Sequence, residues 1–294
     1  MPNFSKKLNI IAKKTDSYLE NIFLKQNNNF KLTKPMKYGL FSGGKRFRSA
    51  IVFNTGKIFD IDNKKLIAIG AAVECIHSYS LMHDDLPAMD NDDLRRGKLS
   101  THKKFNEFTA ILAGNSLLTL AFEILSSNNL KLSKQIKINL INSLSNCSGY
   151  SGLAGGQYSD LNFEKKKISK KKIIDMQKKK TGKLFGFCCE SVGILKNQNL
   201  KSINNLRNIG IEIGLLFQIV DDLIDYRGDT KLAGKPTKSD LKKGKATLIS
   251  LLGYKNSIKY VDKLKLNIFK RLEPYGEKAD HLKKTVNYII ERSK

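Results

Sequence analysis

The chain has 294 residues, of which 40% are hydrophobic, so it can bury a large core and is not a disordered protein. Its 53 Lys and Arg residues outnumber 27 Asp and Glu residues, which gives a formal net charge of +26. Only eight of the basic residues are arginines, and the lysines are spread along the chain. Net charge is therefore the only feature that favours nucleic-acid binding, and we expect no nucleic-acid partner.

The four cysteines lack the spacing of metal ligands and are expected to be small core residues in a reducing compartment. The first ten residues, MPNFSKKLNI, lack the apolar core of a signal peptide. Charged or polar residues interrupt the longest apolar runs before they reach the length of a membrane span. We expect a cytoplasmic protein with no membrane insertion.

The first distinctive segment is SGGKRFRS, residues 42–49, which places Lys45, Arg46 and Arg48 after two glycines. Glycines let a backbone approach a ligand closely, and arginines bind phosphate oxygens through two hydrogen bonds. The spacing is not that of a P-loop. The segment therefore offers cations for a phosphate ligand. Arg46 is expected to point away from the site and to support structure.

A helix is predicted to begin after Asp62, an N-cap residue, and to run through LIAIGAAVECIHSYSLMHDD. Asp84 and Asp85 lie at its C-terminal end, and Pro87 ends it. A turn at Pro87 lets Asp90 fold back toward Asp84. A helix C-terminus disfavours negative charge, so a bound cation explains this cluster better than the alternative of a solvated acidic loop.

No proline occurs between Pro87 and Pro236, and apolar residues recur there every three or four positions. Helix-to-helix loops are expected near residues 128–134, 163–171, 195–202 and 255–258. Hairpin signals are scarce. The pattern predicts an all-α fold of about ten or more helices. We expect one domain over residues 1–294, built as a single large helical bundle around a central apolar cavity.

A second acidic cluster, FQIVDDLID, occupies residues 217–225. Asp221 and Asp225 are four residues apart on one helix face, and Asp222 lies beside them. Hard oxygen ligands of this kind suit Mg²⁺, which shares its shell with waters and substrate phosphates. The basic residues that flank the two clusters include Arg95, Arg96, Lys180, Lys235 and Lys245. Carboxylates and cations together indicate a Mg²⁺-dependent enzyme that acts on a diphosphate.

In this order along the chain, the motifs resemble those of the trans-polyprenyl diphosphate synthases, most closely the bacterial farnesyl diphosphate synthases. GGKRFR resembles the family's G-K-R-x-R segment, and DDLPAMD its first aspartate-rich motif. GLAGGQYSDL, KKTGKLF, FQIVDDLID and GKATL resemble the four motifs that follow. The resemblance extends over nearly the whole chain, and several motifs in the right order are highly specific.

The resemblance implies the isoprenoid synthase fold and the head-to-tail condensation of isopentenyl diphosphate with dimethylallyl or geranyl diphosphate. The implied metal ligands are Asp84, Asp85, Asp90, Asp221, Asp222 and Asp225. Isopentenyl diphosphate is expected to bind Lys45, Arg48, His77 and Arg96. The allylic diphosphate is expected to bind Arg95, Lys180, Thr181, Gln218, Lys235 and Lys245. The catalytic residues, which stabilise the allylic cation, are Lys180, Thr181 and Gln218.

The resemblance also implies a homodimer and about three Mg²⁺ ions per active site, with Mn²⁺ able to substitute. Tyr79 and Ser80, five and four positions before Asp84, are expected to limit the chain length. The aromatic ring of Tyr79 favours the fifteen-carbon farnesyl diphosphate as the product; the alternative is a geranylgeranyl diphosphate synthase.

The sequence leaves the roles of some residues undecided, and two further functions are alternatives. Gln157 and Asp160 line the cavity or tie helices together, and Glu74 is expected to be paired locally. Asn115 and Ala246 stand where the family has Asp and Ser; neither is a metal ligand. A terpene cyclase lacks the second-substrate site that Lys45 suggests. A non-catalytic regulatory subunit is expected to have lost aspartates that are present here.

Overall fold

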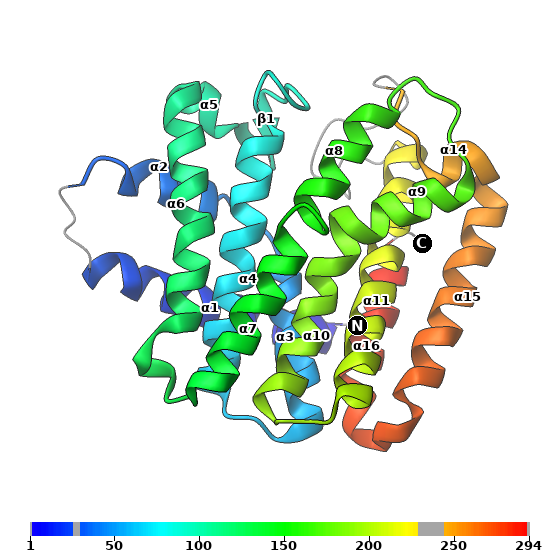
Figure 1. The fold of residues 1–294 in the computed structure, drawn as a ribbon. Helices are drawn as coiled ribbons and strands as arrows, with labels where there is room; N and C mark the ends of the chain where they lie inside the picture. Colours follow the sequence, from blue (N-terminus) through cyan, green and yellow to red (C-terminus); the bar gives the residue numbers. More distant parts are fainter. Residues whose placement is uncertain (1, 26–29, 229–243, 293–294) are drawn as a thin grey trace. The chain divides into compact units, whose positions relative to one another are not determined.

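Residues 2–25, 30–228 and 244–292 are described by a computed structural model, in which nearly all regular structure is helical (Figure 1). This confirms the all-α fold class. The chain divides into two compact units. The first comprises Met1–Phe53 and Asp62–Ile141, and the second Asn54–Ile61 and Asn142–Lys294.

The first unit contains most of the N-terminal helices and a small hairpin. Its elements are α1 (Pro2–Lys25), α2 (Thr33–Leu40), the start of α3 (Phe47–Gly56), α4 (Asn63–Asp84), β1 (Leu94–Arg95), β2 (Lys98–Leu99), α5 (Thr101–Lys104), α6 (Glu107–Ser126), the 3₁₀ turn η2 (Asn128–Leu130) and the start of α7 (Lys134–Ser148).

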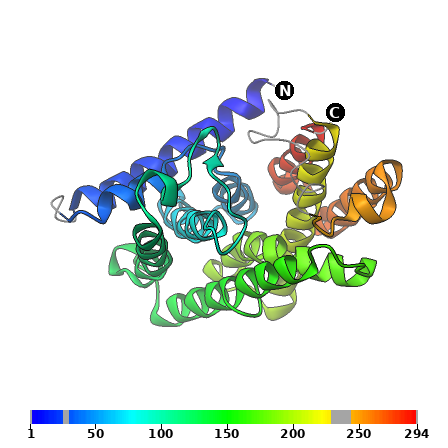
Figure 2. The same ribbon diagram turned by 90° about the horizontal axis from the view of Figure 1, so that it is seen from above.

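The central helix of this unit is α4, which begins as the sequence predicts. The side chain of Asp62 accepts a hydrogen bond of 3.0 Å from the backbone N–H of Lys64, as an N-cap does. Apolar residues occupy all of its faces, so it is buried by α1, α2 and α6 around it. Seen from above, α4 is viewed end-on and α1 crosses the view (Figure 2).

Two helices, α4 and α6, are long and apolar enough to cross a membrane by length and composition alone. Core helices of soluble proteins pass the same test, and 72% of the apolar window of α4 is buried within the protein. The two helices are weak evidence for a membrane span.

A two-stranded hairpin follows the first aspartate motif, and the sequence analysis did not anticipate it. Leu94 pairs with Leu99, and Arg95 pairs with Lys98. The turn residues Arg96 and Gly97 both have positive φ angles, 54° and 75°, which is the conformation of a type I′ turn. The strands are too short for an alternating apolar pattern, so only the Arg-Gly pair could have indicated the turn.

The second unit contains the C-terminal helices. Its elements are η1 (Lys57–Phe59), the end of α7, α8 (Leu153–Phe163), α9 (Lys170–Gln177), the π-helical turn η3 (Lys178–Gly182), α10 (Lys183–Leu195), α11 (Leu200–Arg227), α14 (Leu248–Leu252), α15 (Tyr254–Leu272), η4 (Glu273–Ala279) and α16 (Asp280–Glu291).

The most extensive contact between two helices of this unit is between α10 and α11, which lie side by side (Figure 1). A Cβ atom at Gly210 would lie 2.2 Å from the carbonyl oxygen of Phe185, so the two backbones meet where α11 has no side chain. Asn199 caps the start of α11 with a 2.9 Å hydrogen bond to the N–H of Ser202. Gly228, with φ of 82°, ends it.

Three of the four predicted loops coincide with breaks between helices, at residues 128–134, 163–171 and 195–202. The loop predicted at 255–258 is wrong, because α15 runs through these residues. The break lies just before them, at Gly253, which has a positive φ of 76°. The Lys and Asn residues that suggested a loop instead face solvent on the first turn of α15.

Candidate active site

The first aspartate motif folds back on the end of α4, as the proline predicted. The backbone N–H of Asp90 donates to the carbonyl of Asp84 at 2.8 Å, and that of Asp92 donates to the carbonyl of Asp85 at 3.2 Å. The turn therefore gathers the predicted ligands Asp84, Asp85 and Asp90 at one end of the helix. Asp85 is the most buried of them, at 2% exposed.

Arg95 of the hairpin binds this motif directly. Its Nε donates to Oδ1 of Asp85 at 2.9 Å, Nη2 contacts the same oxygen, and Nη2 also lies 3.3 Å from Oδ2 of Asp92. Burial raises the pKa of Asp85 above its ordinary value, although Arg95 opposes this shift. A carboxylate held in such surroundings gains from a further cation.

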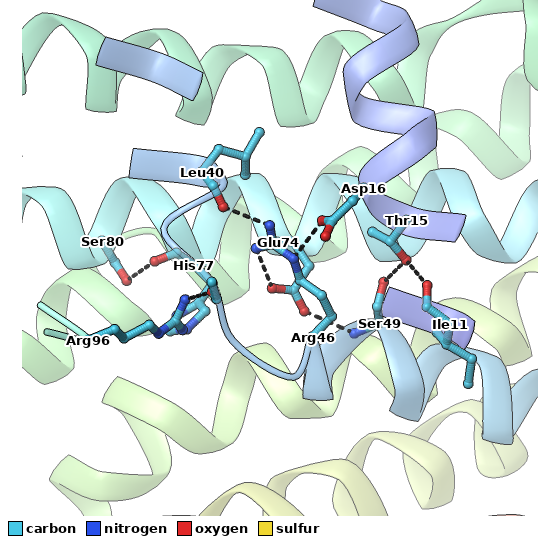
Figure 3. Close-up of polar contacts among 11 residues, drawn as sticks. Ile11, Thr15, Asp16, Leu40, Arg46, Ser49, Glu74, His77, Ser80 and Arg96 are labelled. Carbon is cyan, nitrogen blue, oxygen red and sulfur yellow. Dashed lines mark hydrogen bonds and ion pairs between the residues drawn. The ribbon is translucent and has the colours of Figure 1, made fainter. Parts of the chain in front are cut away.

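The hairpin turn also contacts the Gly-Gly loop. A guanidinium nitrogen of Arg96 donates to the carbonyl of Gly43. A Cβ atom at Gly44 would lie 2.6 Å from this guanidinium, and Gly44 has a φ of 114°, so both the contact and the backbone require glycine there. In Figure 3 the side chain of Arg96 reaches toward His77 of α4.

His77 lies among positive charges. Burial lowers the pKa of His77 well below its ordinary value of about 6.5, and the nearby Arg48 and Arg96 lower it further. The ring is therefore neutral at pH 7. The first unit thus brings together three of the four residues predicted for isopentenyl diphosphate, His77, Arg48 and Arg96. The fourth, Lys45, is exposed two residues before the start of α3.

The second aspartate motif lies on one helix, α11, as predicted. Oδ2 of the buried Asp222 accepts from Nε2 of Gln177 at 3.1 Å, and its Oδ1 accepts from Nε2 of Gln218 at 2.8 Å. Asp225 is also buried. Oδ1 of Asp221 lies 3.2 Å from Nη2 of Arg292.

The predicted catalytic residues Lys180 and Thr181 lie in η3, a π-helical turn that interrupts the helix before α10. Such turns occur often at functional sites. The hydroxyl of Thr181 donates to Oε1 of Gln218 at 3.0 Å, which joins it to the second aspartate motif. Nζ of Lys180 lies 2.6 Å from Oδ2 of Asp160.

Asp160 of α8 holds two lysines. Nζ of Lys245 lies 3.6 Å from the same Oδ2 atom that binds Lys180. Asp160 therefore joins η3 to the segment that carries Lys245. One turn earlier, Gln157 is 5% exposed, and neither polar atom of its side chain has a hydrogen-bond partner in the described part of the chain. A buried amide normally has a partner, so a water or a ligand is expected to complete its hydrogen bonds.

The donor set fits Mg²⁺. Within residues 2–25, 30–228 and 244–292, no three His, Cys, Asp or Glu side chains form a closed metal cage. Mg²⁺ does not require one, since it takes one or two carboxylates and completes its shell with waters and substrate phosphates. Each aspartate motif offers carboxylate oxygens at the end of a buried helix, which is the kind of ligand that Mg²⁺ prefers.

The predicted chain-length residues lie on α4. The half-buried ring of Tyr79 contacts the ring of His83 edge to face, with centroids 5.2 Å apart. His83 is held by the carbonyl of Ile111 at 3.1 Å. Ser80 is buried and donates to the carbonyl of His77 at 2.9 Å, so its hydroxyl is occupied by its own helix.

Gln177 and Arg292 both bind aspartates of the second motif, and neither was predicted from the sequence. Neither lies in a motif that the sequence analysis singled out, and no spacing pattern distinguishes them. Lys235 lies outside the described residues. Ala246 is buried, whereas the side chain of Asn115 is exposed on α6.

Comparison with known proteins identifies the family. The family model described as Polyprenyl synthetase matches residues 29–289. The farnesyl diphosphate synthase of Micrococcus luteus is 43% identical over 267 residues, which cover 90% of each chain. This chain therefore belongs to the polyprenyl synthetase family.

Solved structures agree. The crystal structure of an FPP/GFPP synthase from Zymomonas mobilis has a TM-score of 0.87 and 36% identity, covering 98% of this chain and 99% of that one. A geranyltransferase from Helicobacter pylori, complexed with magnesium and isoprenyl diphosphate, has a TM-score of 0.83 and 29% identity, covering 98% and 96%.

Proposed function

We propose that this protein is a farnesyl diphosphate synthase of isoprenoid biosynthesis. It condenses isopentenyl diphosphate with dimethylallyl diphosphate and then with geranyl diphosphate. The observation that carries this proposal is the 43% identity with the Micrococcus luteus farnesyl diphosphate synthase over 90% of both chains. The two aspartate motifs and the cluster of arginines around His77 supply the chemistry that such a reaction needs.

The allylic diphosphate is bound by carboxylate-held metal and by cations. Asp84, Asp85 and Asp90 form one set of metal ligands; Asp221, Asp222 and Asp225 form the other. When bound, Mg²⁺ neutralises the diphosphate and makes it a good leaving group. Its presence with isoprenyl diphosphate in the Helicobacter pylori geranyltransferase supports this assignment. Arg95, Lys180, Lys235 and Lys245 add positive charge to the same leaving group.

The bond between the allylic carbon and the diphosphate oxygen breaks, and the double bond of isopentenyl diphosphate forms the new carbon–carbon bond. The condensation product then loses a proton to the departed diphosphate. Gln218 orients the hydroxyl of Thr181 through their 3.0 Å hydrogen bond, so that its oxygen dipole stabilises the allylic cation. Apolar surroundings keep water from the cation.

Isopentenyl diphosphate is bound in the first unit by Lys45, Arg48, His77 and Arg96. The neutral ring of His77 contributes a hydrogen bond, while the guanidinium groups bind phosphate oxygens in pairs. This division gives each substrate its own set of cations.

Product analysis tests the proposal. Purified protein is incubated with Mg²⁺, geranyl diphosphate and excess isopentenyl diphosphate, and the products are dephosphorylated and identified. Farnesol is expected as the main alcohol. A main product of geranylgeraniol would reassign the enzyme to longer chains, and no consumption of isopentenyl diphosphate would refute the proposal.

We further propose a soluble cytoplasmic homodimer that pairs through α6. Phe108, Ile111 and Leu112 of α6 are 65%, 41% and 49% exposed and share one face of the helix. An exposed apolar face of this kind indicates a protein interface. Light scattering should give the dimer mass for the natural protein and the monomer mass for Phe108→Glu. A monomeric natural protein would contradict the proposal.

A further inference from the structure

The loop between α2 and α3 has an unusual backbone. Gly43 and Gly44 have φ angles of 100° and 114°, and the next residues are Lys45 and Arg46. Arg46 has a φ of 47°, a left-handed conformation that is uncommon for a residue with a side chain. Contacts that fix Arg46 in this conformation would also fix the shape of the loop.

The side chain of Arg46 provides this fixation. It is 4% exposed and contacts three helices (Figure 3). Nε donates to Oδ1 of Asp16 on α1 at 2.8 Å, Nη2 donates to the carbonyl of Leu40 at the end of α2 at 2.7 Å, and Nη1 lies 3.6 Å from Glu74 of α4. The guanidinium suits these acceptors because its five N–H donors are held in a rigid, planar fork.

Glu74 extends the contact to α3. It is 2% exposed, and its second oxygen accepts from the backbone N–H of Ser49 in the first turn of α3 at 3.2 Å. The hydroxyl of Ser49 lies 2.9 Å from that of Thr15 on α1, close to Asp16 in sequence. The start of α3 is thus fixed relative to α1 and α4, and Arg48 lies within that first turn.

We propose that Arg46 is a positioning residue for isopentenyl diphosphate, and that Asp16 of the N-terminal helix acts through it. This inference rests on the proposed function. Lys45 directly precedes Arg46, and Arg48 follows it by two positions. In the proposed function both bind the substrate. Holding Arg46 in its left-handed conformation sets the direction of the backbone between these two cations. Asp16 lies outside every substrate-binding motif, yet it controls the affinity for one substrate.

The test compares two variants that each remove a carboxylate bound to the Nε atom of an arginine. Asp16→Ala removes the partner of Arg46. Glu212→Ala is the matched control in the second unit. It removes the carboxylate that accepts a hydrogen bond from Nε of Arg271 at 3.2 Å. The measurements are Tm, the KM values of isopentenyl and geranyl diphosphate, and calorimetric binding of isopentenyl diphosphate alone.

Asp16→Ala should raise the KM of isopentenyl diphosphate about tenfold and weaken its calorimetric binding similarly, because misplaced binding groups lose affinity. The KM of geranyl diphosphate should change less than about twofold. Asp16→Glu should restore most of the affinity. Glu212→Ala should lower Tm and leave both KM values unchanged.

Arg46→Lys is the second variant, since it keeps the charge and loses the fork. Arg46→Lys should also raise the KM of isopentenyl diphosphate. If either folded variant loses only thermal stability, or shifts both KM values equally, Arg46 is merely structural and the proposal is wrong. A natural protein that consumes no isopentenyl diphosphate refutes the proposed function instead. Calorimetry then still decides, because unchanged binding in Asp16→Ala would overturn the positioning role.

Discussion

Tyr79 lies five residues before Asp84 on α4, which places its Cα atom about 7.5 Å from that of Asp84 along the helix axis. Its ring packs edge to face on His83, so it has a fixed orientation rather than a free one. We propose that the product chain grows along α4 from the first aspartate motif and meets this ring. The observation supports Tyr79 as the residue that limits the product to fifteen carbons.

Tyr79→Ala should therefore shift the products to twenty carbons or more, with turnover of geranyl diphosphate largely kept. The control is Tyr150→Ala, which removes a ring that is 91% exposed. Chromatography of the dephosphorylated products measures the distribution. An unchanged distribution in Tyr79→Ala would show that another residue sets the limit.

His77 gives the folded protein a pH dependence whose sign can be derived. Its folded-state pKa lies well below the value of about 6.5 in an unfolded chain. Between these two pKa values the unfolded chain binds more protons than the folded protein. The free energy of unfolding therefore begins to fall when the pH drops below about 6.5, and it stops falling once the pH is below the folded-state pKa. Above about pH 8, His77 is neutral in both states and does not make stability depend on pH.

His77→Gln removes this contribution. The free energy of unfolding in urea should fall less for the variant than for the natural protein between pH 7.5 and pH 5. Above about pH 8 the difference between the two proteins should not depend on pH. A difference that stays the same across the whole range would mean that His77 titrates alike in both states.

At the scale of elements, the contact between α10 and α11 depends on a missing side chain. Gly210→Ala would place a methyl group 2.2 Å from the backbone oxygen of Phe185, and this backbone cannot move without separating the helices. The expected loss is about 1–3 kcal/mol in the free energy of unfolding. At Gly193 of α10, by contrast, a Cβ atom would meet the flexible side-chain end of Leu206 at 3.0 Å.

Gly193→Ala is therefore the matched control for Gly210→Ala. Alanine has a higher helix propensity than glycine, and this offsets part of the crowding. The free energy of unfolding of Gly193→Ala should therefore stay within about 1 kcal/mol of that of the natural protein. Urea unfolding measures both variants. Equal losses at the two positions would indicate a general cost of alanine and not a backbone contact.

The helices with strong caps were predictable from sequence. Asp62 and Pro87 frame α4 because capping and proline geometry act locally. The hairpin at Arg95 and the π-helical turn at Lys180 were not, because no period or propensity distinguishes them. The loop expected at residues 255–258 failed for a related reason, since polar residues also occur on the exposed face of a helix such as α15.

The two aspartate clusters could be singled out from the sequence because their residue types and spacing suffice to suggest a cation. Their neighbours were not. Gln177 holds Asp222, and Arg292 lies beside Asp221, from positions 45 and 71 residues away along the chain. Residues that position a ligand from another helix have no local pattern, so the structure is needed to see them.

At the scale of the whole molecule, one aspartate motif lies in each compact unit, and we predict that activity requires both. Asp84→Asn and Asp221→Asn should each lower turnover by orders of magnitude while the protein stays folded. Removal of divalent metal with EDTA should abolish turnover, and Mg²⁺ or Mn²⁺ should restore it. Steady-state assays with added metal measure these effects.

The control for these variants is Asp93→Asn, since the side chain of Asp93 is 66% exposed and pairs with Lys103 at the surface. It belongs to the same acidic stretch as Asp84 but should keep nearly full turnover. If either ligand variant also remains nearly as active as the natural protein, the corresponding motif does not bind the metal.

Arginine is scarce in this chain, with eight residues among 53 basic ones, and several of the eight hold an oxygen acceptor with the guanidinium. Arg46, Arg95, Arg207 and Arg271 each bind a carboxylate, and Arg96 binds a backbone carbonyl. Replacing all eight by lysine would leave the net charge at +26 and the hydrophobic content at 40%. The two chains would look alike by composition. The lysine chain would nevertheless lose the planar guanidinium groups whose hydrogen bonds hold loops and helix ends.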